Sequence, residues 1–102
     1  MNKNILKRAI SKYGTHNQML KCVEECGELS RAISRILIEL SSGDGFTTEE
    51  SQENLYEELA DVSIMTEQVI MMFDCTDEVI SWQLKKLNRL KERLDTNENK
   101  SE

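Results

Sequence analysis

The stretch that decides the fold is KCVEECGELSRAISRILIEL, residues 21–40. Its apolar residues recur every three or four positions, which is the spacing of a buried face on an α-helix. An acidic run, EECGE at residues 24–28, interrupts that face, and a second run, EELAD at residues 57–61, follows in another helical pattern. Carboxylates three positions apart on a helix lie on the same side. Two such runs facing each other would form an oxygen-rich pocket suited to a hard divalent cation such as magnesium.

The hydrophobic pattern around this stretch predicts an all-α protein. The chain of 102 residues contains no proline and few glycines, and no segment has the alternation of a strand. Four helices are expected, at residues 3–13, 16–40, 48–73 and 78–94. Residues 95–102 carry no apolar side chain, so we expect a polar, frayed C-terminal tail beyond a single helical domain of residues 1–94.

Capping residues set the boundaries of these helices. Gly14 is a suitable stop for the first helix. Thr15 is predicted to be the N-cap of the second helix, with Gln18 reaching back in a capping box. The segment TTEE, residues 47–50, is predicted to be a second capping box that opens the third helix.

Composition restricts the class of protein. The formal net charge is −6, which argues against a general nucleic-acid binder because such proteins normally carry a basic surplus. No apolar run approaches the roughly 18 residues that a membrane span needs. The N-terminus leads directly into an amphipathic segment and not into a signal-peptide core. We therefore expect a soluble cytoplasmic protein with no membrane or nucleic-acid partner.

The third predicted helix has apolar residues on more than one side. Ile64, Ile70 and Met71 lie outside its main stripe. Burial on several sides indicates a dimer or a higher oligomer, whereas a central helix within a monomer is the alternative.

The position of each carboxylate around its helix separates buried candidates from solvated ones. With Val62 as the centre of the third helix's stripe, Glu58 lies at roughly 40°, inside the apolar group. Asp61 lies at about 100°, on the border. An unpaired carboxylate inside an apolar stripe costs several kcal/mol, so Glu58 needs a cation, a hydrogen-bond network or a raised pKa.

The second helix has a longer apolar stripe, centred on Cys26. Glu25 and Glu28 lie on one flank of this stripe, and Glu24 points nearly opposite it. Its apolar members are Met19, Cys22, Val23, Cys26, Leu29, Ile33, Ile36, Leu37 and Leu40. The inward set is therefore Glu25, Glu28, Glu58 and Asp61, with Glu24 and Glu57 as outer members. Four converging carboxylates repel one another, and a divalent metal resolves that conflict better than scattered lysines do.

The two acidic motifs resemble a known signature. Glu24-Glu25-x-x-Glu28 followed by Glu58-x-x-Asp61 resembles the EExxE…ExxD pattern of the all-α NTP pyrophosphatase superfamily, in particular its MazG-like branch. The segments KCVEECGELSRAI and NLYEELADVSI resemble the two motif helices of that family. The resemblance spans roughly residues 15–93 of this sequence.

This resemblance implies a fold, a reaction and a set of ligands. It implies a four-helix bundle of the all-α NTP pyrophosphatase type that is completed by dimerisation, sometimes as a tetramer. It implies cleavage of a nucleoside or deoxynucleoside triphosphate to the monophosphate and pyrophosphate, with Mg²⁺ as cofactor and Mn²⁺ as its substitute. Carried over position by position, the metal ligands are Glu25, Glu28, Glu58 and Asp61. Glu24 or Glu25 would take the proton of the attacking water, and the residues leave that choice open.

The last predicted helix carries a basic and aromatic row. Trp82, Lys86, Arg89 and Arg93 recur at helical spacing on the face opposite the leucines, with Lys85 alongside. Contacts with the phosphates and the base are expected from Trp82, Lys85, Lys86, Asn88 and Arg89. The alternative is an ordinary solvated face with a cation–π pair.

Three rival interpretations come from other classes of protein. A structural zinc site could use His16, Cys22, Cys26 and Cys75, but short CxxC spacing is missing. A di-iron bundle would need Glu-x-x-His pairs, which this sequence lacks. The serious alternative is a non-enzymatic helical module that retains the pyrophosphatase fold for assembly.

Overall fold

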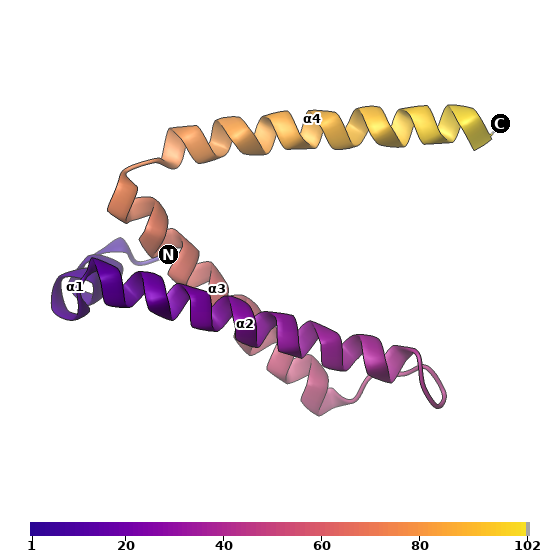
Figure 1. The fold of residues 1–102 in the computed structure, drawn as a ribbon, viewed down its shortest axis with the longest axis horizontal. Helices are drawn as coiled ribbons and strands as arrows, with labels where there is room; N and C mark the ends of the chain where they lie inside the picture. Colours follow the sequence, from indigo (N-terminus) through magenta and orange to yellow (C-terminus); the bar gives the residue numbers. More distant parts are fainter. Residues whose placement is uncertain (102) are drawn as a thin grey trace. The chain divides into compact units, whose positions relative to one another are not determined.

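Residues 1–101 form four helices (Figure 1). The structure, a computed structural model, describes the backbone of residues 1–101 and the side chains of residues 1–97. The helices are α1 (Lys3–Tyr13), α2 (Thr15–Leu40), α3 (Glu49–Phe73) and α4 (Thr76–Ser101). Residues 1–101 contain no strand, so the predicted all-α class is confirmed.

The four helices belong to two compact units. The first unit, Met1–Met72, contains α1, α2 and nearly all of α3, whereas the second, Phe73–Glu102, contains α4. The expected single domain of residues 1–94 stays a prediction. None of the described helices is long and apolar enough to cross a membrane.

The junction of α1 and α2 differs from the expected capping box. Gly14 has φ of 91°, a left-handed conformation that glycine adopts without steric cost. Its N–H donates to Ile10 O at 2.9 Å and its C=O accepts from Gln18 N at 3.0 Å. Gly14 is therefore the N-cap of α2, and Thr15 is already the first helical residue. The prediction of Thr15 as N-cap was wrong by one residue because a single glycine connects the two helices.

The C-terminal helix is longer than the sequence suggested. α4 continues to Ser101, so the expectation that the helix ends near Leu94 was wrong, while the fraying of the polar tail stays a prediction. Residues 95–101 contain neither glycine nor proline to stop the helix. Lys91 Nζ and Asp95 Oδ2 form an ion pair of 3.0 Å that links the expected helix to this extension. Residue 102 lies outside the described part of the chain.

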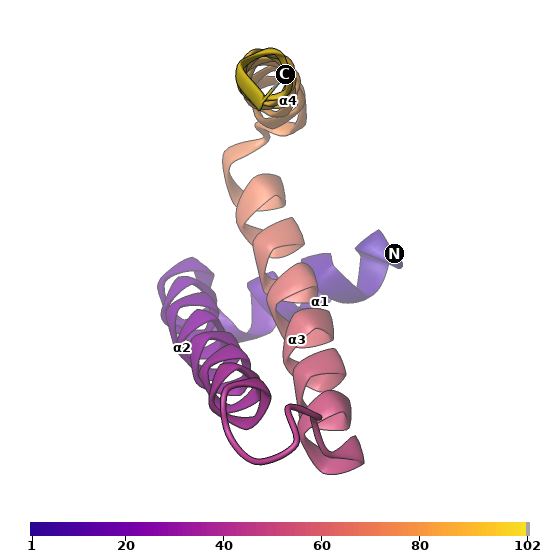
Figure 2. The same cartoon turned by 90° about the vertical axis from the view of Figure 1, so that its right-hand side faces the viewer.

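In the first unit, α2 and α3 run beside each other and present one seam (Figure 2). On each helix, buried or half-buried residues recur in steps of four and three, the period of two helices that pack along their length. On α2 these are all the buried or half-buried residues: Gln18, Cys22, Glu25, Leu29, Ala32, Ile36 and Glu39. On α3 the residues with this spacing are Ser51, Leu55, Glu58, Val62, Met65, Val69 and Met72, and further half-buried or buried residues, Asp61 and Gln68 among them, lie between them in the sequence.

This seam corrects the predicted buried face of α2. Several members of the predicted stripe lie outside the seam, including Val23 at 70% exposed and Leu37 at 60% exposed. Met19, Cys26, Ile33 and Leu40 are exposed as well. The apolar residues of α2 cover two neighbouring faces, and their centre at Cys26 therefore lies away from the face that meets α3. Glu25, expected on a flank, is instead a member of the seam.

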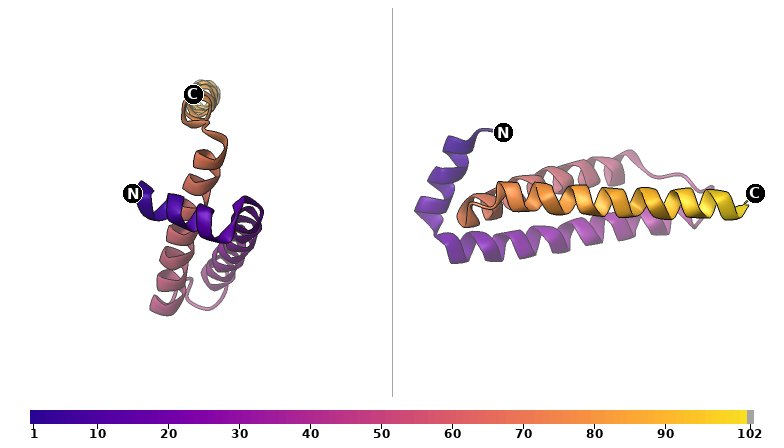
Figure 3. Two further views of the ribbon diagram at one scale, coloured as in Figure 1. Left: turned by 90° about the vertical axis from the view of Figure 1, so that its left-hand side faces the viewer. Right: turned by 90° about the horizontal axis from the view of Figure 1, so that it is seen from above.

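Helix α1 closes one end of the first unit. The chain turns at Gly14, and α1 lies across the end of α2 (Figure 3). Leu6 is the buried residue of α1 and forms the apolar core of this unit together with Ala32 and Met65. The core is small, since most large apolar side chains of the unit remain exposed.

Candidate metal centre

Three carboxylates meet across the α2–α3 seam. Glu25 projects from α2, and Glu58 and Asp61 project from α3, so that one oxygen of each lies within 4.8 Å of the other two. In the part of the chain that the structure describes, this is the one group of three or more Asp, Glu, His or Cys side chains placed to share an ion. We call these three residues the carboxylate cluster.

The helical register explains why these side chains meet. Glu25 and Glu58 occupy positions of the four-three pattern that brings α2 against α3, and Asp61 is one turn beyond Glu58. The Glu25 side chain is only 14% exposed. Glu58 Oε2 is buried and has no hydrogen-bond partner. Leaving a buried charged acceptor unpaired costs free energy, and none of the described ion pairs supplies Glu58 with a counter-charge.

The pKa of Glu58 records this environment. Burial raises the pKa of its carboxyl above the ordinary value of 4.5, because desolvation disfavours the charged form. The negative charges of Glu25, Asp61, Glu28 and Glu57 raise it further, in that order. Glu58 is therefore both desolvated and repelled by its neighbouring carboxylates. Its place inside the apolar stripe predicted the desolvation.

A divalent cation fits this set of donors. Carboxylate oxygens are the ligands that Mg²⁺ and Mn²⁺ prefer, and the three side chains come from two helices that fix their separation. A positive ion among them would satisfy Glu58 Oε2 and remove the repulsion that raises its pKa. The orphaned oxygen is the observation that distinguishes this cluster from an ordinary acidic surface.

The other acidic residues of the two motifs lie outside the cluster. Glu28 Oε1 accepts a hydrogen bond from Arg31 Nη2 at 3.0 Å, and its side chain is about half exposed. It nevertheless lies close enough to raise the pKa of Glu58. Glu24 and Glu57 are exposed, in agreement with their expected outer positions. The structure thus brings together three of the four predicted ligands, and the role of Glu28 as a ligand stays a prediction.

A second orphaned oxygen lies further along the seam. Gln68 is 3% exposed, and its Oε1 is buried without a partner, while its Nε2 donates to Met65 Sδ at 3.8 Å. Unlike Glu58, Gln68 carries no charge. Its unsatisfied acceptor therefore does not call for a cation.

Sequence reasoning did not anticipate two contacts of the motif helix. Lys21 Nζ lies 3.5 Å from Glu25 Oε1, and Arg31 pairs with Glu28. Both pairs have the i,i+4 or i,i+3 spacing at which helical side chains meet, so the spacing in the sequence was the signal for them.

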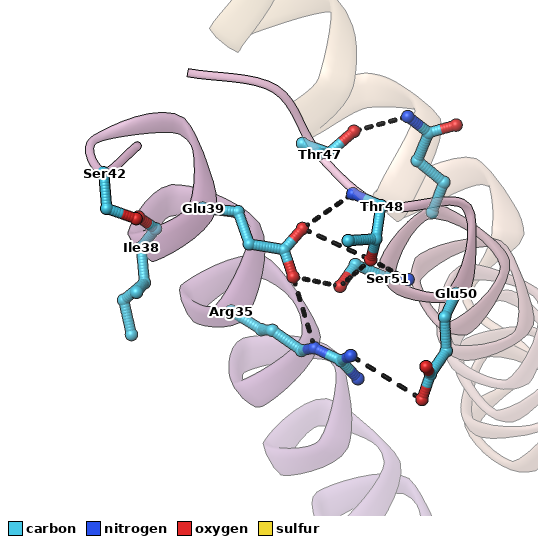
Figure 4. A network of polar contacts seen from close by, with 9 residues as sticks. Arg35, Ile38, Glu39, Ser42, Thr47, Thr48, Glu50 and Ser51 are labelled. Atoms are coloured by element: carbon cyan, nitrogen blue, oxygen red, sulfur yellow. Dashed lines mark hydrogen bonds and ion pairs between the residues drawn. The ribbon is translucent and has the colours of Figure 1, made fainter. Parts of the chain in front are cut away.

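At the loop end of the seam, Glu39 organises a separate network (Figure 4). Its Oε1 accepts a hydrogen bond from Thr48 N at 2.9 Å, and its Oε2 accepts one from Ser51 Oγ. Arg35 Nε lies 3.5 Å from Glu39 Oε2, and Arg35 Nη2 lies 3.6 Å from Glu50 Oε1. The hydrogen bond from Ser51, then that from Thr48, lowers the pKa of Glu39, with a smaller contribution from Arg35.

This network replaces the capping box expected at residues 47–50. Thr48 is the residue that caps α3, because its Oγ1 accepts from Ser51 N at 3.1 Å. In a capping box, a side chain from the first turn of the same helix would bond the N–H of the cap residue. Here Glu39 of α2 takes that position. The predicted box was wrong because the partner comes from the neighbouring helix.

The residues expected to hold phosphates and base lie on α4, in the second unit. Lys85 Nζ lies 4.8 Å from the centre of the Trp82 ring, a cation–π pair. Trp82 and Lys86 also line one shallow hollow of α4, together with Val79 and Leu87. The contacts of Lys85, Lys86, Asn88, Arg89 and Trp82 with a nucleotide stay predictions.

The zinc alternative finds no support in the first unit. Cys22 and Cys26 are free thiols, and burial, followed by the neighbouring Cys26, raises the pKa of Cys22. Within the described residues of this unit, His16 does not join them in a group that could share an ion.

Comparison with known proteins identifies the family. A family model for the MazG nucleotide pyrophosphohydrolase domain matches residues 14–93. This match covers most of the chain, which therefore belongs to the MazG family, and it confirms the resemblance noted in the two acidic motifs. No curated protein and no solved structure matched the chain.

Proposed function

We propose that this protein is a Mg²⁺-dependent nucleoside triphosphate pyrophosphohydrolase that converts NTP or dNTP to the monophosphate and pyrophosphate. Membership of the MazG family supports nucleotide pyrophosphohydrolase activity in general. The observation that carries the metal dependence is Glu58, whose Oε2 is buried and unpaired and whose carboxylate lies beside those of Glu25 and Asp61. Mn²⁺ is the expected substitute, since it takes the same oxygen ligands.

In this proposal, some acidic residues bind the cation and another accepts a proton. Glu25, Glu58 and Asp61 would hold the cation, and Glu28 would join them on leaving Arg31. When bound, such a cation neutralises phosphate charge and acidifies an attacking water. Glu24 is exposed beside the cluster, and Glu24 or Glu25 would accept the water's proton.

Substrate contacts and assembly complete the proposal. Trp82, Lys85, Lys86, Asn88 and Arg89 would bind the base and the leaving pyrophosphate, which needs cationic partners. The exposed apolar face of α2, which includes Val23, Ile33 and Leu37, supports a homodimer or homotetramer in which a second copy covers it. A cytoplasmic location and the absence of nucleic-acid binding stay predictions.

The test is a panel of NTPs and dNTPs incubated with the full chain, with and without Mg²⁺. Pyrophosphate should be released from at least one nucleotide, and chelation of the metal should stop the release. If no nucleotide yields pyrophosphate, the proposed enzyme function is wrong. Release of orthophosphate alone would mean that a different bond is cleaved.

The non-enzymatic module makes a different prediction for the same residue. If the chain serves only assembly, Glu58→Ala should leave the oligomeric state and stability intact or improved, with no activity to lose. If the enzyme interpretation holds, the same variant should keep its oligomeric state and lose pyrophosphate release.

A further inference from the structure

Lys21 lies at the solvent edge of the carboxylate cluster. Its Nζ is 3.5 Å from Glu25 Oε1, one helical turn away on α2. The Lys21 side chain is 54% exposed, whereas that of Glu25 is 14% exposed. The ammonium group therefore lies at the solvent side of the carboxylate that it contacts.

Helix stability does not explain this contact. Exposed ion pairs contribute little, and a lysine placed four residues before a glutamate is the less favourable order along a helix. The same order occurs in the pair of Lys91 and Asp95 on α4, where both side chains are more than half exposed. The two pairs differ in the acid, because only Glu25 belongs to a cluster of carboxylates.

Charge balance gives Lys21 a role when an anion enters. Three carboxylates carry three negative charges, so a divalent cation leaves the cluster negative. A triphosphate is itself strongly anionic and needs a further positive charge at that point. Among the described ion pairs, that of Lys21 and Glu25 is the one that involves a member of the cluster. Arg31, the nearest alternative along α2, contacts Glu28, which lies outside the cluster.

We propose that Lys21 is a phosphate-binding residue of this site. In the free protein its ammonium group contacts Glu25. When a cation takes the charge of that carboxylate, the attraction between Lys21 and Glu25 weakens, and the ammonium group binds a non-bridging phosphate oxygen of the substrate. This assignment rests on the proposed function, because it names a contact of the same substrate at the same cluster.

The test compares Lys21→Met with Lys91→Met, which removes a matched exposed pair on another helix. Calorimetry on the full chain measures the affinity for Mg²⁺ alone and, at saturating Mg²⁺, the affinity for inorganic tripolyphosphate, a phosphate chain without a base. Lys21→Met should weaken tripolyphosphate binding about tenfold or more, the usual effect of losing a hydrogen bond to a charged group. Its Mg²⁺ affinity should be unchanged or slightly higher. Lys91→Met should match the wild type in both, and Lys21→Arg should keep most of the affinity for tripolyphosphate.

Two results would overturn the assignment. Unchanged tripolyphosphate affinity in Lys21→Met would remove Lys21 from the phosphate contacts. A parallel loss of Mg²⁺ affinity would mean that Lys21 only positions Glu25. The proposed function is tested separately. If the wild type binds tripolyphosphate through Lys21 but releases no pyrophosphate from any nucleotide, the assignment of Lys21 holds and the proposed reaction is wrong. A wild type that binds no tripolyphosphate would contradict the phosphate contact itself.

Discussion

Two glutamates of the α2–α3 seam, Glu39 and Glu58, have opposite electrostatic environments. Glu39, at the loop end, accepts hydrogen bonds from Thr48 and Ser51 and pairs with Arg35, so the pKa of its carboxyl is lowered. Glu58, about two turns beyond Ser51 on α3, has an oxygen without a partner and carboxylates around it, so its pKa is raised. Both occupy the repeating positions of α2 and α3 that face the other helix.

The difference shows how a structural carboxylate can be told from a functional one. The protein itself satisfies Glu39, and what this residue contributes is the joining of α2 to the start of α3. The described protein atoms do not satisfy Glu58. A buried carboxylate oxygen without a hydrogen-bond partner destabilises the fold, so its presence in Glu58 points to a ligand that the protein does not supply.

The largest expected effect is the loss of activity in Glu58→Gln. The amide keeps the shape of the side chain but removes the negative charge that a hard cation requires. Pyrophosphate release at neutral pH should fall by at least about 100-fold, the upper end of the loss caused by changing an outer partner of a metal ligand. Glu39→Gln is the control, and it should retain wild-type activity at temperatures where it is folded. Equal losses in the two variants would contradict the distinction between them.

Asp61→Asn should have the next largest effect, on metal affinity. Asp61 is half-buried and contributes one of the three oxygens of the cluster. The variant should fold normally by circular dichroism, and its affinity for Mg²⁺ should fall by about tenfold or more. An unchanged Mg²⁺ affinity, measured by calorimetry, would remove Asp61 from the ligand set.

The two glutamates should also affect stability with opposite dependence on pH. The folded-state pKa of Glu58 is raised, so its carboxyl stabilises the fold below the ordinary value of 4.5, and this contribution is lost as pH rises through the raised pKa. The folded-state pKa of Glu39 is lowered, so its contribution is present above 4.5 and is lost as pH falls through the lowered pKa. Without metal at neutral pH, Glu58→Gln should therefore be more stable than the wild type and Glu39→Gln less stable.

Urea unfolding of both variants and the wild type, in chelator and across the acidic range, measures this prediction. The advantage of Glu58→Gln should disappear below pH 4.5, and the deficit of Glu39→Gln should disappear once the pH is below the lowered pKa of Glu39. If both variants shift stability in the same direction at neutral pH, the contrast between the two sites is wrong.

The smallest expected effect comes from Thr48→Ala. Removing the side chain that caps Ser51 N should cost about 1 kcal/mol of unfolding free energy, a typical value for the loss of an N-cap. Thr66→Ala is the control, because Thr66 lies within α3 and bonds only the preceding turn, at Ser63 O. A cost for Thr48→Ala no larger than that of the control would show that Glu39 alone organises the start of α3.

Periodicity predicted the helices, and the acidic spacing predicted that Glu25, Glu58 and Asp61 meet. Glu58 could be found because its place in an apolar stripe is a local property of one helix. The buried face of α2 could not be predicted in this way, because its apolar residues cover two faces and only packing against α3 determines which face is buried. The cap supplied by Glu39 also escaped prediction, because it joins residues nine and twelve positions apart on different helices. Local rules describe one helix, whereas these features depend on two.

The central claim is that the carboxylate cluster, and not the acidic surface in general, binds the divalent cation. A ligand that binds only the folded state raises the unfolding free energy, by about 2.7 kcal/mol at 100 times its dissociation constant. Thermal unfolding should therefore be followed with increasing Mg²⁺ for the wild type, Glu58→Gln and Glu39→Gln. We expect the melting temperature of the wild type and of Glu39→Gln to rise with increasing Mg²⁺. The melting temperature of Glu58→Gln should not change. An equal rise in all three, or no rise in the wild type, would contradict the central claim.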